Sequence, residues 1–268
     1  MKPIGGKRLK TLPVRILIPN AVTLLALCAG LTSMRFAYEG RWEVSAVAIL
    51  IAAVLDSLDG ALARALKGAS KFGAELDSLS DMVSFGVAPA FFLYVWSLHE
   101  LGRFGWVIAL VYGLCCALRL ARFNTALEAK TPPTAWGRHY FTGLPAPGAA
   151  GLVMLPLYID FQFESGLTQS VLVVAPLTIL ISLLMVSRAH TYSFRRLNVR
   201  RDYVLPLVLA FVLIGAFLSS YQWGTLTALG ITYLATVPIA ANDYRNEEKR
   251  HASRGQPPPD DSAPPSEG

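Results

Sequence analysis

Long apolar segments alternate with short polar ones along most of this chain. A helix needs about 20 apolar residues to cross the hydrocarbon core of a bilayer, and eight stretches approach that length. They lie near residues 16–37, 43–66, 74–98, 104–127, 144–160, 168–187, 203–219 and 223–242. The fifth and seventh stretches are the shortest, and the fifth begins with two closely spaced prolines. The pattern predicts an all-α integral membrane protein built as a bundle of about eight transmembrane helices.

Basic residues are concentrated at both ends of the chain and in alternate connections between the predicted spans. Lys and Arg cluster in residues 2–15, 64–71, 119–138, 188–201 and 245–254. The other connections contain only Arg41 and Arg103 as basic residues. Connections rich in Lys and Arg stay in the cytoplasm, so both termini are predicted to be cytoplasmic. Because this pattern accounts for the net charge of +6, nucleic acid is not an expected partner.

The composition supports a single membrane domain with polar ends. Hydrophobic residues make up 53% of the chain and the mean hydropathy is +0.45, which is too apolar for an ordinary soluble domain. We assign residues 16–243 to the membrane domain. Residues 1–15 are basic with interleaved apolar side chains, which fits either an amphipathic surface helix or an ordinary positive flank. Residues 244–268 are rich in Pro, Ser and charge and are expected to be disordered.

Four aspartates lie near the ends of two predicted spans, where charge is costly. Asp56 and Asp59 are three residues apart, and Asp77 and Asp81 are four apart, so each pair shares one helix face. Intramembrane acids need partners, and Arg64 is the one basic residue within the two acidic segments 56–64 and 73–81. Hard divalent cations prefer oxygen ligands. Two facing helices would therefore direct the carboxylates at a pair of divalent cations near the cytoplasmic surface.

The same residues carry a family resemblance. The pattern D-x-x-D-G-x-x-A-R, then eight residues, then G-x-x-x-D-x-x-x-D resembles the signature of the CDP-alcohol phosphatidyltransferases. The eight fixed positions are Asp56, Asp59, Gly60, Ala63, Arg64, Gly73, Asp77 and Asp81. Four further segments resemble those of the members of that family that use serine: residues 19–23, 76–90, 119–124 and 141–151. The resemblance extends over roughly residues 15–240.

The resemblance implies that the hydroxyl of L-serine displaces CMP from CDP-diacylglycerol, which makes phosphatidylserine. Two Mg²⁺ or Mn²⁺ ions would be held by Asp56, Asp59, Asp77 and Asp81. The last of these, Asp81, would also be the catalytic general base. The CDP group would be contacted by Gly60, Arg64, Ser70, Asn20 and Thr23. The family further implies a homodimer. From the distribution of Lys and Arg we expect an integral protein of the bacterial inner membrane, among its lipids, with the active site facing the cytoplasm.

The acceptor is less closely defined by the sequence. Arg119 and Arg122, at the end of the fourth predicted span, could hold the serine carboxylate or a lipid phosphate. A snorkelling positive flank explains them equally well. Residues 82–90 contain no Lys or Arg, which favours serine over a phosphorylated acceptor. Glycerol 3-phosphate, inositol phosphate and choline remain alternative acceptors.

A cation transporter is the alternative from a different class of protein. Transporter sites usually lie near the bilayer midplane, between repeated halves of the chain. Here the acids belong to one pair of spans, near their cytoplasmic ends, and no second copy of the motif occurs in the sequence. Release of CMP from CDP-diacylglycerol would distinguish the transferase from a transporter.

Overall fold

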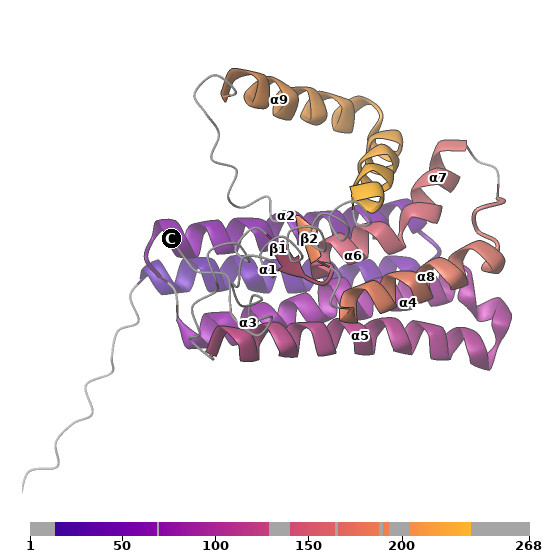
Figure 1. Cartoon of the computed structure of the whole chain (residues 1–268), viewed down its shortest axis with the longest axis horizontal. Coiled ribbons are helices and arrows are strands. Elements are labelled where there is room, and N and C mark those ends of the chain that lie inside the picture. Colours follow the sequence, from indigo (N-terminus) through magenta and orange to yellow (C-terminus); the bar gives the residue numbers. More distant parts are fainter. Residues whose placement is uncertain are drawn as a thin grey trace, which may run out of the picture.

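Four long helical segments lie side by side and form the body of the protein (Figure 1). We describe a computed structural model that covers residues 14–68, 70–128, 140–163, 166–187, 190–192 and 204–236. The first two segments are α1 (Val14–Tyr38) and α2 (Trp42–Ala65). The third is continuous through α3 (Lys71–Asp81), a π-helix η1 (Met82–Val87) and α4 (Ala88–Trp96). The fourth is α5 (Arg103–Glu128).

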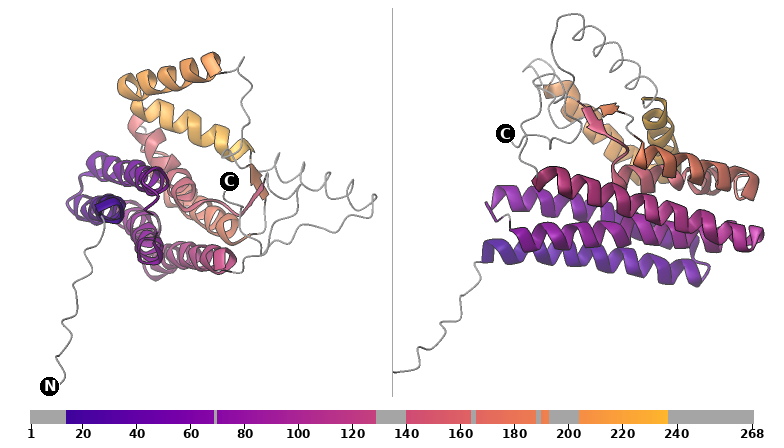
Figure 2. Two further views of the ribbon diagram at one scale, coloured as in Figure 1. Left: turned by 90° about the vertical axis from the view of Figure 1, so that its left-hand side faces the viewer. Right: turned by 60° about the horizontal axis from the view of Figure 1, so that its bottom comes forward.

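Shorter elements complete the fold. A 3₁₀ turn η2 (Leu98–Leu101) leads into α5, and the chain continues through α6 (Ala146–Val153), α7 (Leu155–Phe163) and α8 (Val171–Val186). Next come α9 (Val204–Ser220) and a further helical stretch over residues 222–236. Strands β1 (Tyr140–Thr142) and β2 (His190–Tyr192) pair antiparallel, with Phe141 opposite Thr191. In the end-on view of Figure 2, α8 and the 222–236 helix lie to one side of the four long helices.

The four long segments are also the candidate membrane spans. Within the described residues, each is long and apolar enough to cross a bilayer. Large apolar side chains such as Leu25, Val54 and Leu114 point outward and are more than half exposed, as expected for surfaces that face lipid. The protein is therefore an integral membrane protein, and its helical class is confirmed. The full set of eight spans and the cytoplasmic termini stay predictions.

Small polar residues fix the third segment against α1. Ser80 donates a hydrogen bond to the Thr23 carbonyl (3.2 Å), and Ser84 donates to the Ala26 carbonyl (3.3 Å). Gly30 lies against Ser84 so closely that a Cβ there would sit 2.6 Å from the Ser84 Oγ. Small residues of this kind let membrane helices approach closely. They hold α3, which carries two of the predicted acids, beside α1.

Two predicted spans differ from simple α-helices. The predicted span 144–160 is broken at Met154 into α6 and α7. Pro156 explains the break, since proline has no amide hydrogen to bond the carbonyl of residue 152. The predicted span 74–98 contains the π-helix η1. The predicted tail 244–268 and all but the last two residues of the segment 1–15 lie outside the described residues.

Candidate active site

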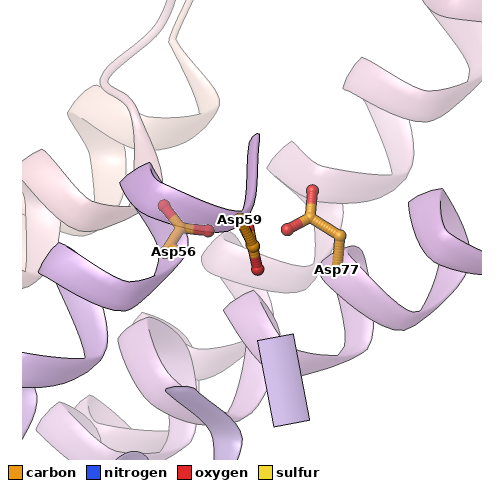
Figure 3. Close-up of side chains that lie close together, drawn as sticks. All are labelled: Asp56, Asp59 and Asp77. Atoms are coloured by element: carbon orange, nitrogen blue, oxygen red, sulfur yellow. The ribbon is translucent and has the colours of Figure 1, made fainter. Parts of the chain in front are cut away.

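Three of the four predicted acids converge where α2 faces α3. Asp56 and Asp59 project from α2 and Asp77 from α3, with their carboxylates turned toward one another (Figure 3). One carboxylate oxygen from each lies within 4.8 Å of the others. Oxygen ligands grouped this closely fit a hard divalent cation.

The surroundings of Asp59 test whether the cluster fits a bound cation. The residue is only 4% exposed, and its Oδ2 atom is buried without a hydrogen-bond partner among the residues that the structure describes. A buried anionic oxygen left unpaired is strongly destabilising, and a bound cation would supply the partner that this atom lacks. Thr23 approaches the same carboxylate from α1.

Asp81 lies one helical turn beyond Asp77 on α3, beside the three clustered acids. Its carboxyl group is within hydrogen-bonding contact of Asp56 and also lies near Asp77. Four carboxyl groups this close repel one another unless protons or cations neutralise them. Three of the four predicted acids therefore converge, and Asp81 lies beside one of them, Asp56.

The α2–α3 connection brings the two halves of the motif together. After α2 ends, Lys67 takes a left-handed conformation (φ 50°), and the Gly68 amide donates to the Ala63 carbonyl (2.9 Å). A Cβ at Gly68 would overlap the Arg15 carbonyl, so the loop can lie directly on α1. Ser70 then caps α3 by accepting a hydrogen bond from the Gly73 amide at 3.0 Å. This short connection makes α2 and α3 face each other.

A cavity of about 230 Å³ opens beside the acids, between α1, α2 and α3. Asp59 and Asp77 form part of its wall. The five residues predicted to contact the CDP group also line it: Asn20, Thr23, Gly60, Arg64 and Ser70. At Gly73, also in the wall, a Cβ would lie 2.8 Å from the Asn20 Oδ1 atom. The absence of a side chain there keeps this part of the cavity open.

The structure separates the two arginines that the sequence left equivalent. Arg119 lies near Asp81 and is surrounded by Cys116, Tyr112 and Tyr233. Its Nε atom is buried, and no described residue accepts a hydrogen bond from it. Arg122, about one turn further along α5, is exposed. Arg119 therefore belongs to the candidate site, and its Nε is available to an anionic group beside Asp81.

Sequence reasoning missed the contact between Asn124 and Ser78. The Asn124 Nδ2 atom donates to the Ser78 Oγ atom at 2.9 Å, which ties α5 to the part of α3 between Asp77 and Asp81. Asn124 ends the segment 119–124 that carried part of the family resemblance. The place of Asn124 in that segment was the available signal in the sequence. Its contact with Ser78 could not be read from the sequence, because it depends on how α3 and α5 pack.

Fold and site together define a helical membrane protein with a cation-compatible carboxylate cluster beside a polar cavity. Residues 16–186 match the CDP-alcohol phosphatidyltransferase family, and residues 202–238 match the family described as CDP-alcohol phosphatidyltransferase 2. The chain belongs to the CDP-alcohol phosphatidyltransferase family.

Individual relatives carry related names. The CDP-diacylglycerol–serine O-phosphatidyltransferase of Mycobacterium leprae is 37% identical over 229 residues, covering 85% of this chain and 76% of the relative. The protein of that name from Helicobacter pylori is 32% identical over 184 residues, covering 68% and 74%. The archaetidylserine synthase of Methanothermobacter thermautotrophicus is 33% identical over 174 residues, covering 64% and 68%.

Proposed function

We propose that this chain is a phosphatidylserine synthase, which transfers the phosphatidyl group from CDP-diacylglycerol to the hydroxyl of L-serine and releases CMP. One observation carries the proposal: the acidic cluster opens onto the cavity that the predicted CDP contacts line. A substrate diphosphate bound in that cavity would lie next to the carboxylates. The names of the relatives from Mycobacterium leprae and Helicobacter pylori support serine as the acceptor.

The residues of the cluster divide the chemistry between them. Two Mg²⁺ or Mn²⁺ ions, held by Asp56, Asp59, Asp77 and Asp81, would neutralise the diphosphate and stabilise the leaving phosphate oxygen. Arg64, exposed at the cavity wall, would pair with a substrate phosphate through charge-assisted hydrogen bonds. Gly60 and Gly73 leave room for the nucleotide to approach the backbone.

Asp81 is the proposed general base. Its carboxylate takes the proton of the serine hydroxyl as the serine oxygen bonds to the phosphatidyl phosphorus. The bond from that phosphorus to the oxygen of the CMP phosphate breaks, and CMP leaves with the electron pair. Asp81 suits this role because it lies beside Asp56 of the cluster and near Arg119.

Arg119 is the proposed anchor for the acceptor. A guanidinium whose Nε has no partner within the described part of the chain can bind the serine carboxylate. Because Arg119 lies near Asp81, a serine held there would present its hydroxyl to the base. Arg122 is exposed and has no such place in the mechanism.

The setting of the reaction follows from the location of the acids. CDP-diacylglycerol would enter sideways from the lipid and serine from the cytoplasm, at an active site facing the cytoplasm in the bacterial inner membrane. Eight spans, cytoplasmic termini and a homodimer complete the proposed arrangement. The alternating distribution of Lys and Arg supports this topology.

Release of CMP by the purified protein tests the proposed function. CDP-diacylglycerol and Mn²⁺ or Mg²⁺ would be supplied with serine, glycerol 3-phosphate, inositol phosphate or choline, one at a time. We expect release with serine alone. Release with another alcohol would keep the transferase and replace its acceptor. No release with any of the four would contradict the proposed reaction and favour a cation transporter.

A further inference from the structure

The helix that carries Asp81 changes geometry at the next residue. Met82–Val87 form a π-helix, in which the Ala88 amide reaches back to the Val83 carbonyl, five residues earlier. Pro89 accounts for this wider turn, because it has no amide hydrogen for the Phe85 carbonyl four residues earlier and its ring would clash with that carbonyl. Such π-turns are rare and occur frequently at functional sites.

The Phe85 carbonyl receives its hydrogen bond from another helix. The Tyr112 hydroxyl on α5 donates to it at 3.0 Å, and the Tyr112 side chain is fully buried. Next to this bond, a Cβ at Gly86 would lie 3.1 Å from the Cys116 Cβ and Sγ atoms. α5 thus packs directly on the π-turn, and Tyr112 supplies a donor for the carbonyl deprived by Pro89.

We propose that Tyr112 is a positioning residue for the reaction: its hydroxyl holds the π-turn and thereby sets the direction in which Asp81 points. This inference rests on the proposed role of Asp81. α4, on the far side of the turn, is anchored in the core by Phe92 and Leu93. Asp81 is the residue directly before the turn, so a change in the turn would alter the direction of its side chain.

α5, which carries Tyr112, also carries Arg119, the proposed anchor for the acceptor. Arg119 is seven residues, or about two turns, beyond Tyr112, with Cys116 between them on one face of α5. The face that holds the π-turn through Tyr112 therefore places Arg119 beside Asp81. Tyr112 thus links the base and the anchor through α5, and it is not among the residues that line the cavity beside the acids.

The test is the Tyr112→Phe variant, which removes only the hydroxyl. Tyr158→Phe is the matched control, because Tyr158 is also fully buried and its hydroxyl has no hydrogen-bond partner among the described residues. We expect Tyr112→Phe to lower kcat for serine-dependent CMP release by about tenfold or more, since a 1 Å misplacement can cost on the order of 100-fold. KM for CDP-diacylglycerol should stay unchanged. Tyr158→Phe should match the wild type.

A second readout does not depend on turnover. Mn²⁺ affinity, measured by electron paramagnetic resonance, should fall several-fold in Tyr112→Phe because Asp81 moves from its neighbour Asp56. Wild-type values for both kcat and Mn²⁺ affinity in Tyr112→Phe would overturn the inference. A wild-type protein that releases no CMP with any acceptor would refute the proposed function instead, while Mn²⁺ affinity would still test Tyr112.

Pro89→Ala tests the role of the π-turn by a change in α4, the helix that follows the turn. Alanine restores the amide for the Phe85 carbonyl and favours an ordinary α-turn. We expect kcat to fall although the melting temperature does not. A purely structural role for the turn predicts wild-type kcat in this variant, and that result would also overturn the inference. If Tyr112→Phe does not fold, Pro89→Ala decides the question.

Discussion

Asp59 shows at the level of one residue why we propose an ion site for the acidic cluster. Its side chain is nearly inaccessible to solvent, and its neighbours Asp56 and Asp77 carry the same charge. Desolvating a charge costs several kcal/mol even after the protein relaxes. A cluster of this kind is poorly explained by stability, because apolar side chains of similar volume would serve the fold better. The proposed binding of metal ions gives a reason for its presence.

Replacing Asp81 by Asn removes the proposed proton acceptor while keeping the size of the side chain. We expect kcat for CMP release to fall by about 10²–10⁴-fold. The melting temperature of the variant should match that of the wild type, which would show that it is folded. Glu75→Gln, an exposed position on the same helix, is the control and should retain wild-type kcat. Substantial turnover by Asp81→Asn would remove Asp81 as the base.

Arg119 and Arg122 on α5 should differ in their effect on serine binding. Loss of hydrogen bonds to a charged group costs about 1.5–3 kcal/mol, and 1.4 kcal/mol corresponds to tenfold. We therefore expect Arg119→Gln to raise KM for serine by about tenfold or more, and Arg122→Gln to leave it near the wild-type value. Steady-state kinetics with varied serine would measure both. Equal effects of the two substitutions would contradict the assignment of Arg119.

At the scale of elements, the sequence located the helices well and their local geometry poorly. The predicted span 16–37 corresponds to α1 and 43–66 to α2, because runs of apolar residues are a local property. The convergence of the acids also followed from helical spacing. The π-turn η1 was missed, although Pro89 was its visible signal, since the donor for Phe85 comes from Tyr112 on another helix. Contacts between distant segments also decided which arginine faces the site.

Gly73 offers a prediction about the start of α3. In Gly73→Ala, the new Cβ would crowd the Asn20 Oδ1 atom at 2.8 Å and intrude on the cavity. We expect a higher KM for CDP-diacylglycerol without a lower melting temperature, because alanine favours the helix. Gly113→Ala on α5 is the control, since nothing lies within 4 Å of its Cβ position. It should stabilise the protein by up to about 1 kcal/mol with unchanged kinetics. An unchanged KM in Gly73→Ala would argue against nucleotide binding in this cavity.

The whole molecule combines outward-facing apolar surfaces with a polar site near one end of its long helices. Large exposed side chains on α1, α2 and α5 suit a lipid environment. The acidic cluster and its cavity lie toward the α2–α3 connection, which belongs to one of the basic segments of the chain. This arrangement would let a lipid substrate and a water-soluble acceptor meet at the membrane surface.

The proposed topology places the α2–α3 connection in the cytoplasm and the α1–α2 connection outside. Single cysteines introduced as Lys67→Cys and Glu39→Cys would report these positions through a membrane-impermeant maleimide. We expect labelling of position 39 in intact cells and of position 67 only in inverted membrane vesicles. The protein without an added cysteine is the control for reaction at its native thiols. The opposite labelling pattern would contradict a site facing the cytoplasm.

Metal dependence of serine-driven CMP release is the most direct test of the central claim, that the clustered aspartates form the metal site of a phosphatidyl transfer. Purified protein would be stripped with EDTA and supplied with CDP-diacylglycerol, L-serine and increasing Mn²⁺ or Mg²⁺. We predict no release without metal, recovery as metal is added, and no recovery for Asp59→Asn at the same concentrations. Full turnover in EDTA, or wild-type recovery by Asp59→Asn, would contradict the account.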